Sequence, residues 1–181
     1  MAKRGSPTTI MQHSQKSKIN NLELETRQLL PTIFNSNNSL LKVNKMSNFK
    51  ILKAPYDTHK KRDSDTIVAV IDCSDAATVN DFYVQIQKGL KFPTYFGKNL
   101  DALYDCLCDF SWLDTREVHV VLRSYDSFLA KEPKNKRWDI LAVLNDAAAE
   151  WKAMKGADKI KFEIYVEPST RIKQDLEDAE V

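Results

Sequence analysis

Three short segments with strand patterns, separated by stretches with helical periodicity, restrict the folds that are open to this chain. Residues 66–72 and 117–123 are apolar runs rich in β-branched residues, which are typical of strands buried within a sheet. Residues 159–166 alternate between polar and apolar side chains, which also indicates a strand. Because two helical segments separate each pair of strands, the order is β-α-α-β-α-α-β, and helical crossovers join parallel strands. The sequence therefore predicts an α/β domain: a small three-stranded parallel sheet packed by about four helices.

Local signals mark the helices between these strands. Thr78 followed three residues later by Asp81 forms a capping box, and Asn99 is a favourable N-cap for the second helix. Apolar positions then recur at helical spacing. We therefore expect helices at about 79–89, 99–110, 125–130 and 138–155. After Pro168 we expect an acidic C-terminal tail, residues 169–181, that is frayed from about residue 174 onward.

The first part of the chain differs in charge from the rest. Residues 1–64 hold 12 Lys/Arg against 4 Asp/Glu, a net charge of +8, whereas residues 65–181 carry a net charge of −6. With few aromatic residues, 1–64 can bury little apolar surface, so we expect a mostly disordered basic extension before a domain at 65–168. A short helix is expected at 21–30. Met46 offers a second translation start. The basic residues are dispersed, which favours a solvated linker over a nucleic-acid-binding arm, and any binding to nucleic acid through this extension is expected to be weak.

The chain lacks the motifs of common enzymes and metal sites: it has no H-E-x-x-H, G-x-S-x-G, Walker loop or dinucleotide fingerprint. Its three cysteines, Cys73, Cys106 and Cys108, do not describe a disulfide framework, so we expect reduced thiols. His119 lies inside an apolar run, where a packed strand residue is expected. No apolar run could span a membrane and no secretory signal is evident. We therefore expect a cytoplasmic protein without catalytic residues, metal or cofactor.

The predicted second helix carries the most informative pattern. At about 100° per residue, its apolar stripe consists of Leu100, Leu103, Leu107 and Phe110. The opposite row consists of Asp101, Asp105 and Asp109. Tyr104 lies between the row and the stripe. Three interpretations stay open: a solvated helix face, a carboxylate pair for metal or acid–base chemistry, and an anionic surface that recognises a basic partner.

The segment around this helix resembles a known family. Phe-Pro-Thr-Tyr-Phe-Gly-Lys-Asn-Leu-Asp-Ala-Leu-Tyr-Asp-Cys-Leu, residues 92–107, is similar to the signature of the barstar family, intracellular inhibitors of bacterial ribonucleases. The resemblance covers about 65–168 and implies a three-stranded parallel sheet packed by helices. It also implies that the acidic helix and the preceding loop bind a basic ribonuclease active site. The positions that match the family's contacts are Tyr95, Gly97, Asp101, Tyr104 and Asp105, and more loosely Asp146.

Two positions depart from the family pattern and bear on the choice of partner. Lys98 stands where an acidic residue is frequent, and Tyr104 stands where tryptophan is frequent. The resemblance predicts a ribonuclease inhibitor with an immunity or antitoxin role in a bacterial cytoplasm. We expect a monomer that binds a small basic extracellular-type ribonuclease or a similar basic toxin. Two alternatives stay open: a carboxylate-dependent hydrolase using Asp101 and Asp105, and an interaction module of this fold for another basic partner.

Overall fold

The computed structural model describes residues 46–57, 65–156 and 159–178 of the 181-residue chain. The helix predicted at 21–30 lies outside these residues. The elements are β1 (Phe49–Ile51), β2 (Thr66–Asp72), α2 (Val79–Gly89), α3 (Leu100–Asp109), β3 (Glu117–Arg123), the 3-10 turn η1 (Tyr125–Ser127), α4 (Lys134–Ala153), β4 (Lys161–Val166) and α5 (Thr170–Asp178). Among the described helices, none is long and apolar enough to cross a membrane.

The strands form one parallel sheet in the order β1-β4-β3-β2. In the central rows, Ala69 lies opposite Val120, which in turn lies opposite Ile164, and all three are fully buried. The predicted strands at 66–72, 117–123 and 159–166 are confirmed, and so is their parallel arrangement. The predicted number of three strands is wrong, because β1 adds a fourth. This three-residue strand is too short to show a pattern, and it forms by pairing with the edge of β4.

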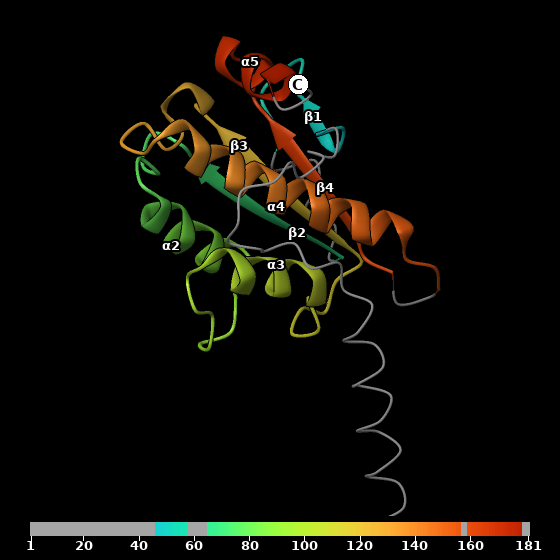
Figure 1. The fold of residues 1–181 in the computed structure, drawn as a ribbon. Helices are drawn as coiled ribbons and strands as arrows, with labels where there is room; N and C mark the ends of the chain where they lie inside the picture. Colours follow the sequence, from blue (N-terminus) through green and yellow to red (C-terminus); the bar gives the residue numbers. More distant parts are fainter. Residues whose placement is uncertain (1–45, 58–64, 157–158, 179–181) are drawn as a thin grey trace, which may run out of the picture. The chain divides into compact units, whose positions relative to one another are not determined.

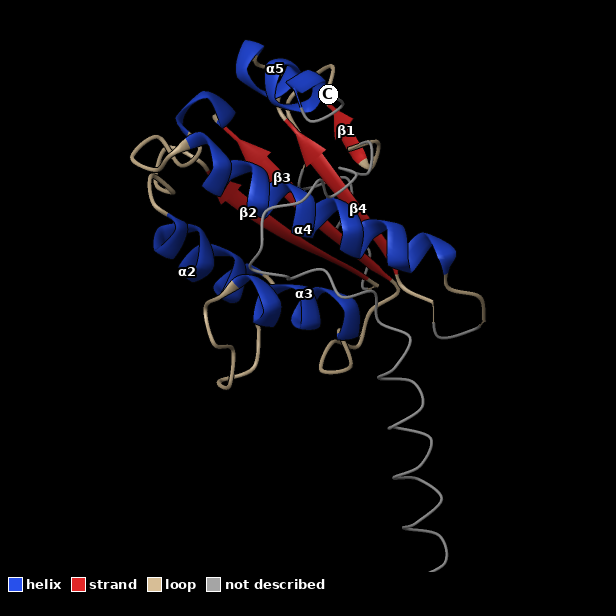
Figure 2. Ribbon diagram, in the orientation of Figure 1, coloured by secondary structure: helices blue, strands red, loops and turns tan. Residues whose placement is uncertain are grey.

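Three helices cover one face of the sheet. Figure 1 shows α2, α3 and α4 on the same side of the strands, and Figure 2 separates these blue helices from the red sheet. The predicted caps are present: Thr78 and Asp81 form the capping box of α2, and Asn99 caps α3. Between helices and sheet lies one apolar core. The helices therefore hold their outer faces in fixed orientations.

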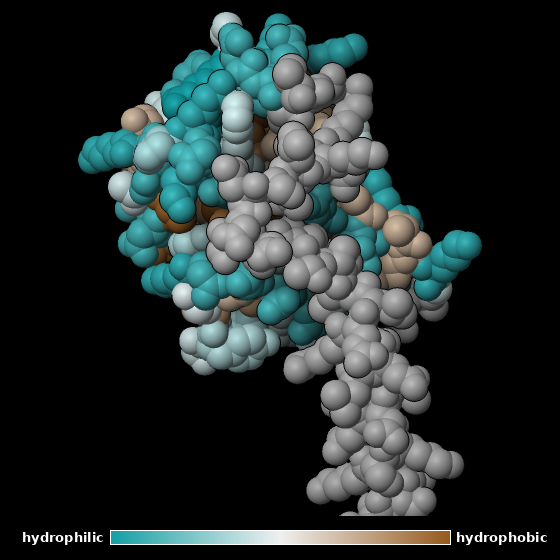
Figure 3. Space-filling view, in the orientation of Figure 1, coloured by the Kyte–Doolittle hydropathy of each residue, from teal (hydrophilic) through white to brown (hydrophobic). Residues whose placement is uncertain are grey.

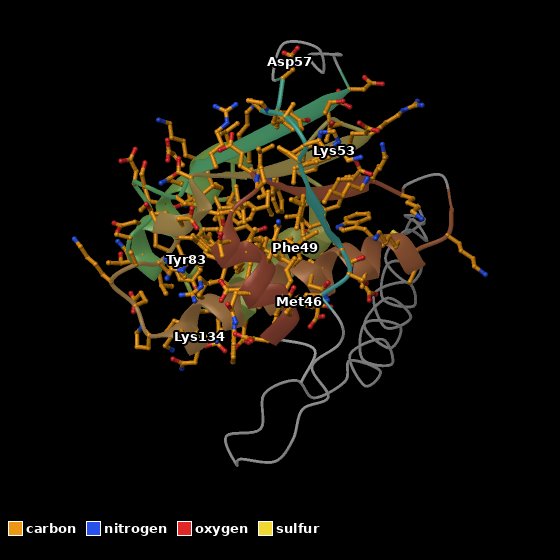
Figure 4. The ribbon with its side chains drawn as sticks, turned by 90° about the horizontal axis from the view of Figure 1, so that it is seen from above. Met46, Phe49, Lys53, Asp57, Tyr83 and Lys134 are labelled. Atoms are coloured by element: carbon orange, nitrogen blue, oxygen red, sulfur yellow. The ribbon has the colours of Figure 1, made fainter. Side chains whose placement is uncertain are left out.

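The segment before β2 packs on the domain, although the sequence alone groups it with the basic extension. Figure 4 follows it from Met46 on the helix side, past Phe49 in β1, to Asp57 beyond the opposite side of the sheet. Met46 is buried, and so is Tyr56, whose hydroxyl lies 2.5 Å from Nδ1 of the buried His119. These contacts join positions far apart in the sequence, so local pattern could not reveal them.

The C-terminal residues also differ from the prediction of a frayed tail, because Thr170–Asp178 form helix α5. Arg137 of α4 donates from Nε and Nη2 to the Asp175 carboxylate at 2.6 and 2.9 Å, and the Tyr125 hydroxyl donates to it at 2.9 Å. Both charged side chains are buried, and the hydrogen bonds to Asp175 raise the pKa of Arg137. We call these three residues the buried ion-pair network. It anchors a helix whose acidic composition gave no sign of packing.

Candidate functional site

Helix α3 is held rigidly on its inner side. Leu103 and Leu107 are fully buried, as the apolar stripe predicted. At the first turn, the Asn99 side chain accepts a hydrogen bond from the Ala102 amide at 2.8 Å. Near the last turn, the Trp151 indole of α4 donates to the Leu107 carbonyl at 2.7 Å. Both ends of α3 are therefore fixed, and rotation of the helix would break these contacts.

This orientation places the aspartates of α3 outward. Asp101, Asp105 and Asp109 are exposed, as predicted. Asp109 accepts a weak hydrogen bond from the backbone of Ser111 at 3.3 Å. Within the part of the chain that the structure describes, the side chains of Asp101 and Asp105 have no hydrogen-bond donor and no lysine or arginine in ion-pair contact. Their charges face solvent without an internal counterion.

The loop before α3 carries an exposed aromatic side chain on a buried base. Phe92 and Phe96 are buried and pack edge to face with their ring centroids 5.0 Å apart, whereas Tyr95 between them is 73% exposed. A Cβ atom added to Gly97 would lie 3.1 Å from Nδ2 of Asn99, so a side chain there would press on the residue that caps α3. The loop projects from the helix layer (Figure 1). Tyr95 and Gly97 are thus exposed in the loop that leads directly into the helix that carries the aspartates.

Tyr104 lies where α3 meets α4. The side chain is half-buried, and burial raises its pKa, with further contributions from Cys108 and from the charges of Glu150 and Asp146. These two acidic residues belong to α4, so their influence places α4 along the Tyr104 edge of α3. Burial raises the pKa of the Cys108 thiol to about 12 and outweighs the opposite influence of Tyr104. The thiol is therefore protonated near neutral pH and a weak nucleophile.

Asp146 of α4 differs in burial from the aspartates of α3, which are exposed. It is partly buried, and burial raises its pKa even though the Asn145 amide donates to its Oδ1 at 3.2 Å. Asp146 is partly buried on a helix against which α3 packs. Burial removes part of the water around this carboxylate and so disfavours its charged form. No lysine or arginine among the described residues forms an ion pair with it.

Sequence reasoning missed two further acidic positions, Asp139 and Glu150. With Asp146 they stand at i, i+7 and i+11, which places all three on one side of α4. This spacing was readable, but only packing shows that the row runs beside α3. We call the combined surface the acidic face; its members are Tyr95, Gly97, Asp101, Tyr104, Asp105, Asp109, Asp139, Asp146 and Glu150. On the side shown in Figure 3, the residues that are not covered are mainly hydrophilic.

The chemistry open to the acidic face follows from its composition. Asp101 and Asp105 lie one helical turn apart on an exposed surface, and in the described ranges no cluster of three or more His, Cys, Asp or Glu side chains is arranged to hold a metal ion. A general acid–base pair needs a site that excludes water and positions a substrate, which an exposed helix row does not provide. Carboxylates without counterions beside half-buried aromatic rings are suited to binding cationic side chains.

Comparison with known proteins agrees with this geometry. Residues 66–167 match the family model described as Barstar (barnase inhibitor). The chain is also 33% identical over 86 residues to a Bacillus subtilis (strain 168) protein described as "Putative ribonuclease inhibitor YrdF". That match covers 46% of this chain and 87% of the relative. Strand β1 and helix α5 lie outside residues 66–167, the range of the family match. From the family match over more than half its length, the parallel sheet and the acidic helix, the chain belongs to the barstar family.

Proposed function

We propose that this chain is a protein inhibitor that binds a basic ribonuclease through the acidic face and occludes its active site. The observation that carries the proposal is the pair Asp101 and Asp105, exposed and without internal counterions on a helix fixed at both ends. A ribonuclease active site is rich in Lys and Arg because it binds RNA phosphates. Two carboxylates held one turn apart present negative charge to the same cationic groups.

The rigidity of α3 is important for affinity. Side chains that are ordered before binding lose less conformational entropy when the complex forms. Tyr95 and Tyr104 then exclude water around the charge pairs, which strengthens electrostatic interactions by lowering the local dielectric. Opposite potentials also accelerate the encounter, so the association rate should fall steeply as salt concentration rises.

The proposal includes a biological setting. A secreted ribonuclease endangers the cell that makes it, and an intracellular inhibitor would protect that cell. We therefore propose an immunity or antitoxin role in a bacterial cytoplasm, with the inhibitor monomeric until it binds. A basic partner of another kind, bound through the same surface, is the competing outcome in the following test.

The test uses barnase, the nuclease for whose inhibition the barstar family is named. Its hydrolysis of RNA is titrated with the full chain, and binding is measured by calorimetry at two salt concentrations. We expect stoichiometric inhibition that weakens with salt. The variant Asp101→Asn/Asp105→Asn should lose inhibition, whereas Asp75→Ala, which removes an exposed carboxylate outside the acidic face, should keep it. Full activity of barnase, and of a ribonuclease encoded beside the gene, at saturating wild-type chain would refute the proposal.

A further inference from the structure

One asparagine of the segment before β2 contacts the helix that carries part of the acidic face. Asn48 lies in the turn before β1, between the buried Met46 and Phe49, both labelled in Figure 4. Its side chain contacts Asn145 of α4, which is 97 positions away in the sequence. The family match begins only at residue 66. This contact is therefore a feature of the chain that the family match does not include.

Three hydrogen bonds join Asn48 to Asn145. The backbone N–H of Asn48 and its Nδ2 donate to Asn145 Oδ1 at 3.3 and 3.0 Å, and Nδ2 also donates to the Asn145 carbonyl at 3.0 Å. The Oδ1 of Asn48 in turn accepts a hydrogen bond from Nζ of Lys152, further along α4. Asn145 is only 2% exposed, so its amide depends on partners within the protein.

These hydrogen bonds fix the direction of the Asn145 amide. An asparagine side chain can turn over and exchange its oxygen and nitrogen, so partners whose roles are unambiguous must define its orientation. A backbone N–H can only donate, so the atom of Asn145 that faces the Asn48 N–H is the oxygen. The Asn145 carbonyl can only accept and the Lys152 ammonium can only donate, so the amide of Asn48 is oriented as well. The nitrogen of the Asn145 amide is thereby left for another partner.

That partner is Asp146 of the acidic face. Nδ2 of Asn145 donates to Oδ1 of Asp146 at 3.2 Å, and no other described residue donates a hydrogen bond to this carboxylate. The hydrogen bond acts to lower the pKa of Asp146, against the burial that raises it. A reversed amide would place the oxygen of Asn145 against the carboxylate, and two acceptors in contact repel each other. The direction of one buried amide therefore decides whether Asp146 meets a donor or an acceptor.

We propose that Asn48 is a positioning residue of the acidic face, which holds the Asn145 amide so that its donor meets the Asp146 carboxylate. The inference rests on the function proposed above only in giving Asp146 a cationic group of the partner to bind. A carboxylate that is already held in place and ionised loses less conformational entropy when such a group binds it. The segment before β2 then contributes to binding through α4, without contacting the partner itself.

The positioning can be tested on the free chain, without any partner. Side-chain carboxyl resonances of isotope-labelled protein are followed by NMR through a pH titration, which gives the pKa of Asp146. Asn48→Ala removes the side-chain donors that hold the Asn145 amide, so the pKa of Asp146 should rise further above its ordinary value. Ser47→Ala, an exposed residue of the same turn, is the matched control and should leave this pKa unchanged. An Asp146 pKa that is the same in wild type and in folded Asn48→Ala would overturn the inference.

A second variant covers the case in which Asn48→Ala does not fold. Asn48→Ser keeps a polar side chain in the turn but is too short to contact Asn145 and Lys152 together. Urea unfolding establishes which variants are folded under the conditions of the titration. We expect the same direction of change for the Asp146 pKa in Asn48→Ser, and its absence in this folded variant would equally count against the positioning.

Binding to barnase measures the consequence for the acidic face. Asn48→Ala should weaken the affinity by up to about tenfold, as expected for one hydrogen bond to a charged group. The same substitution is then made in Asp146→Asn, which completes a double-mutant cycle. If Asn48 acts through the Asp146 carboxylate, its removal should have no further effect in this background. An unchanged affinity in the first case, or an equal loss in both, would refute its role as a positioning residue.

The two measurements separate this inference from the proposed function. If Asn48→Ala raises the pKa of Asp146 while the wild-type chain leaves both ribonucleases named above fully active, the positioning stands and the ribonuclease proposal fails. If the wild-type chain inhibits barnase and Asn48→Ala leaves the pKa of Asp146 unchanged, the function stands and the positioning fails.

Discussion

The carboxylates of the acidic face and of the buried ion-pair network differ in burial and in hydrogen bonding. Asp175 is buried and receives hydrogen bonds from both Arg137 and Tyr125. Asp101 and Asp105 are exposed and receive none from the described residues. Hydrogen bonds and an opposite charge therefore stabilise the carboxylate that anchors α5. The exposed carboxylates on α3 have no such partners and add no comparable stability to the fold. Binding to an external partner accounts for this row of aspartates better than packing does.

The largest expected effect is on binding. Replacing Asp105 by alanine removes a charge from the centre of the acidic face, and the cations of the partner would stay desolvated without their counterion. Loss of one member of a buried charge pair costs about 2–5 kcal/mol, equivalent to a loss in affinity of up to a few thousandfold. Because the exposed Asp105 side chain forms no hydrogen bond or ion pair with any described residue, the unfolding midpoint in urea should not change. Calorimetry with barnase checks the affinity; an unchanged value in a folded variant would contradict the comparison.

Substitution in the buried ion-pair network should give the reverse result. Asp175→Ala leaves the Arg137 guanidinium buried without its counterion, which typically costs about 3–5 kcal/mol of folding free energy. Urea unfolding should show this loss, whereas the folded fraction should bind barnase as wild type does. Asp126→Ala, an exposed aspartate of η1, is the control for general effects of removing charge near α5. A weakened affinity in folded Asp175→Ala would mean that the network also shapes the acidic face.

The pH dependence of stability should have opposite signs for a carboxylate whose pKa is raised by burial, Asp146, and for one whose pKa is lowered by hydrogen bonds, Glu163. Burial raises the pKa of Asp146, so the folded state binds a proton more readily than the unfolded state does, and stability falls as pH rises through this range. Asp146→Asn should therefore be more stable than wild type at neutral pH, and the difference should vanish in acid. Urea unfolding across a pH series measures it. A variant less stable than wild type at neutral pH would show that the charged form is stabilised internally.

Glu163 provides the contrasting case. Burial acts to raise its pKa, but hydrogen bonds from Lys50 and Tyr165 outweigh it and hold the pKa at about 2. Its charged form therefore stabilises the fold above the ordinary carboxyl pKa, and this contribution is lost as pH falls towards 2. Glu163→Gln should be less stable than wild type at neutral pH in the same pH series, with a gap that narrows in acid.

What the sequence could predict depended on the range of the interactions. Periodicity within one segment located β2, β3 and β4 and oriented α3, because burial of one face leaves a local pattern. Strand β1 and helix α5 depend on partners far along the chain, namely the edge of β4 and Arg137, so nothing local marked them. The acidic row of α4 had a readable spacing. Its place beside α3 follows only from the packing of these two helices.

The smallest expected effect concerns a charge at the border of the acidic face. Lys98 is exposed in the loop before α3 and adds positive charge where the partner is also expected to be positive. Lys98→Glu should raise the association rate with barnase several-fold at low salt, since border charges act mainly on the encounter, and little at high salt. The backbone of Lys98 is left-handed, with φ of 49°, so a substitution can also disturb the loop. Lys98→Gln shares that conformational risk and removes only one charge. Association rates that increase from lysine to glutamine to glutamate at position 98 would assign the effect to charge. Equal rates for all three would show that Lys98 does not contribute to the electrostatic attraction between the partner and α3.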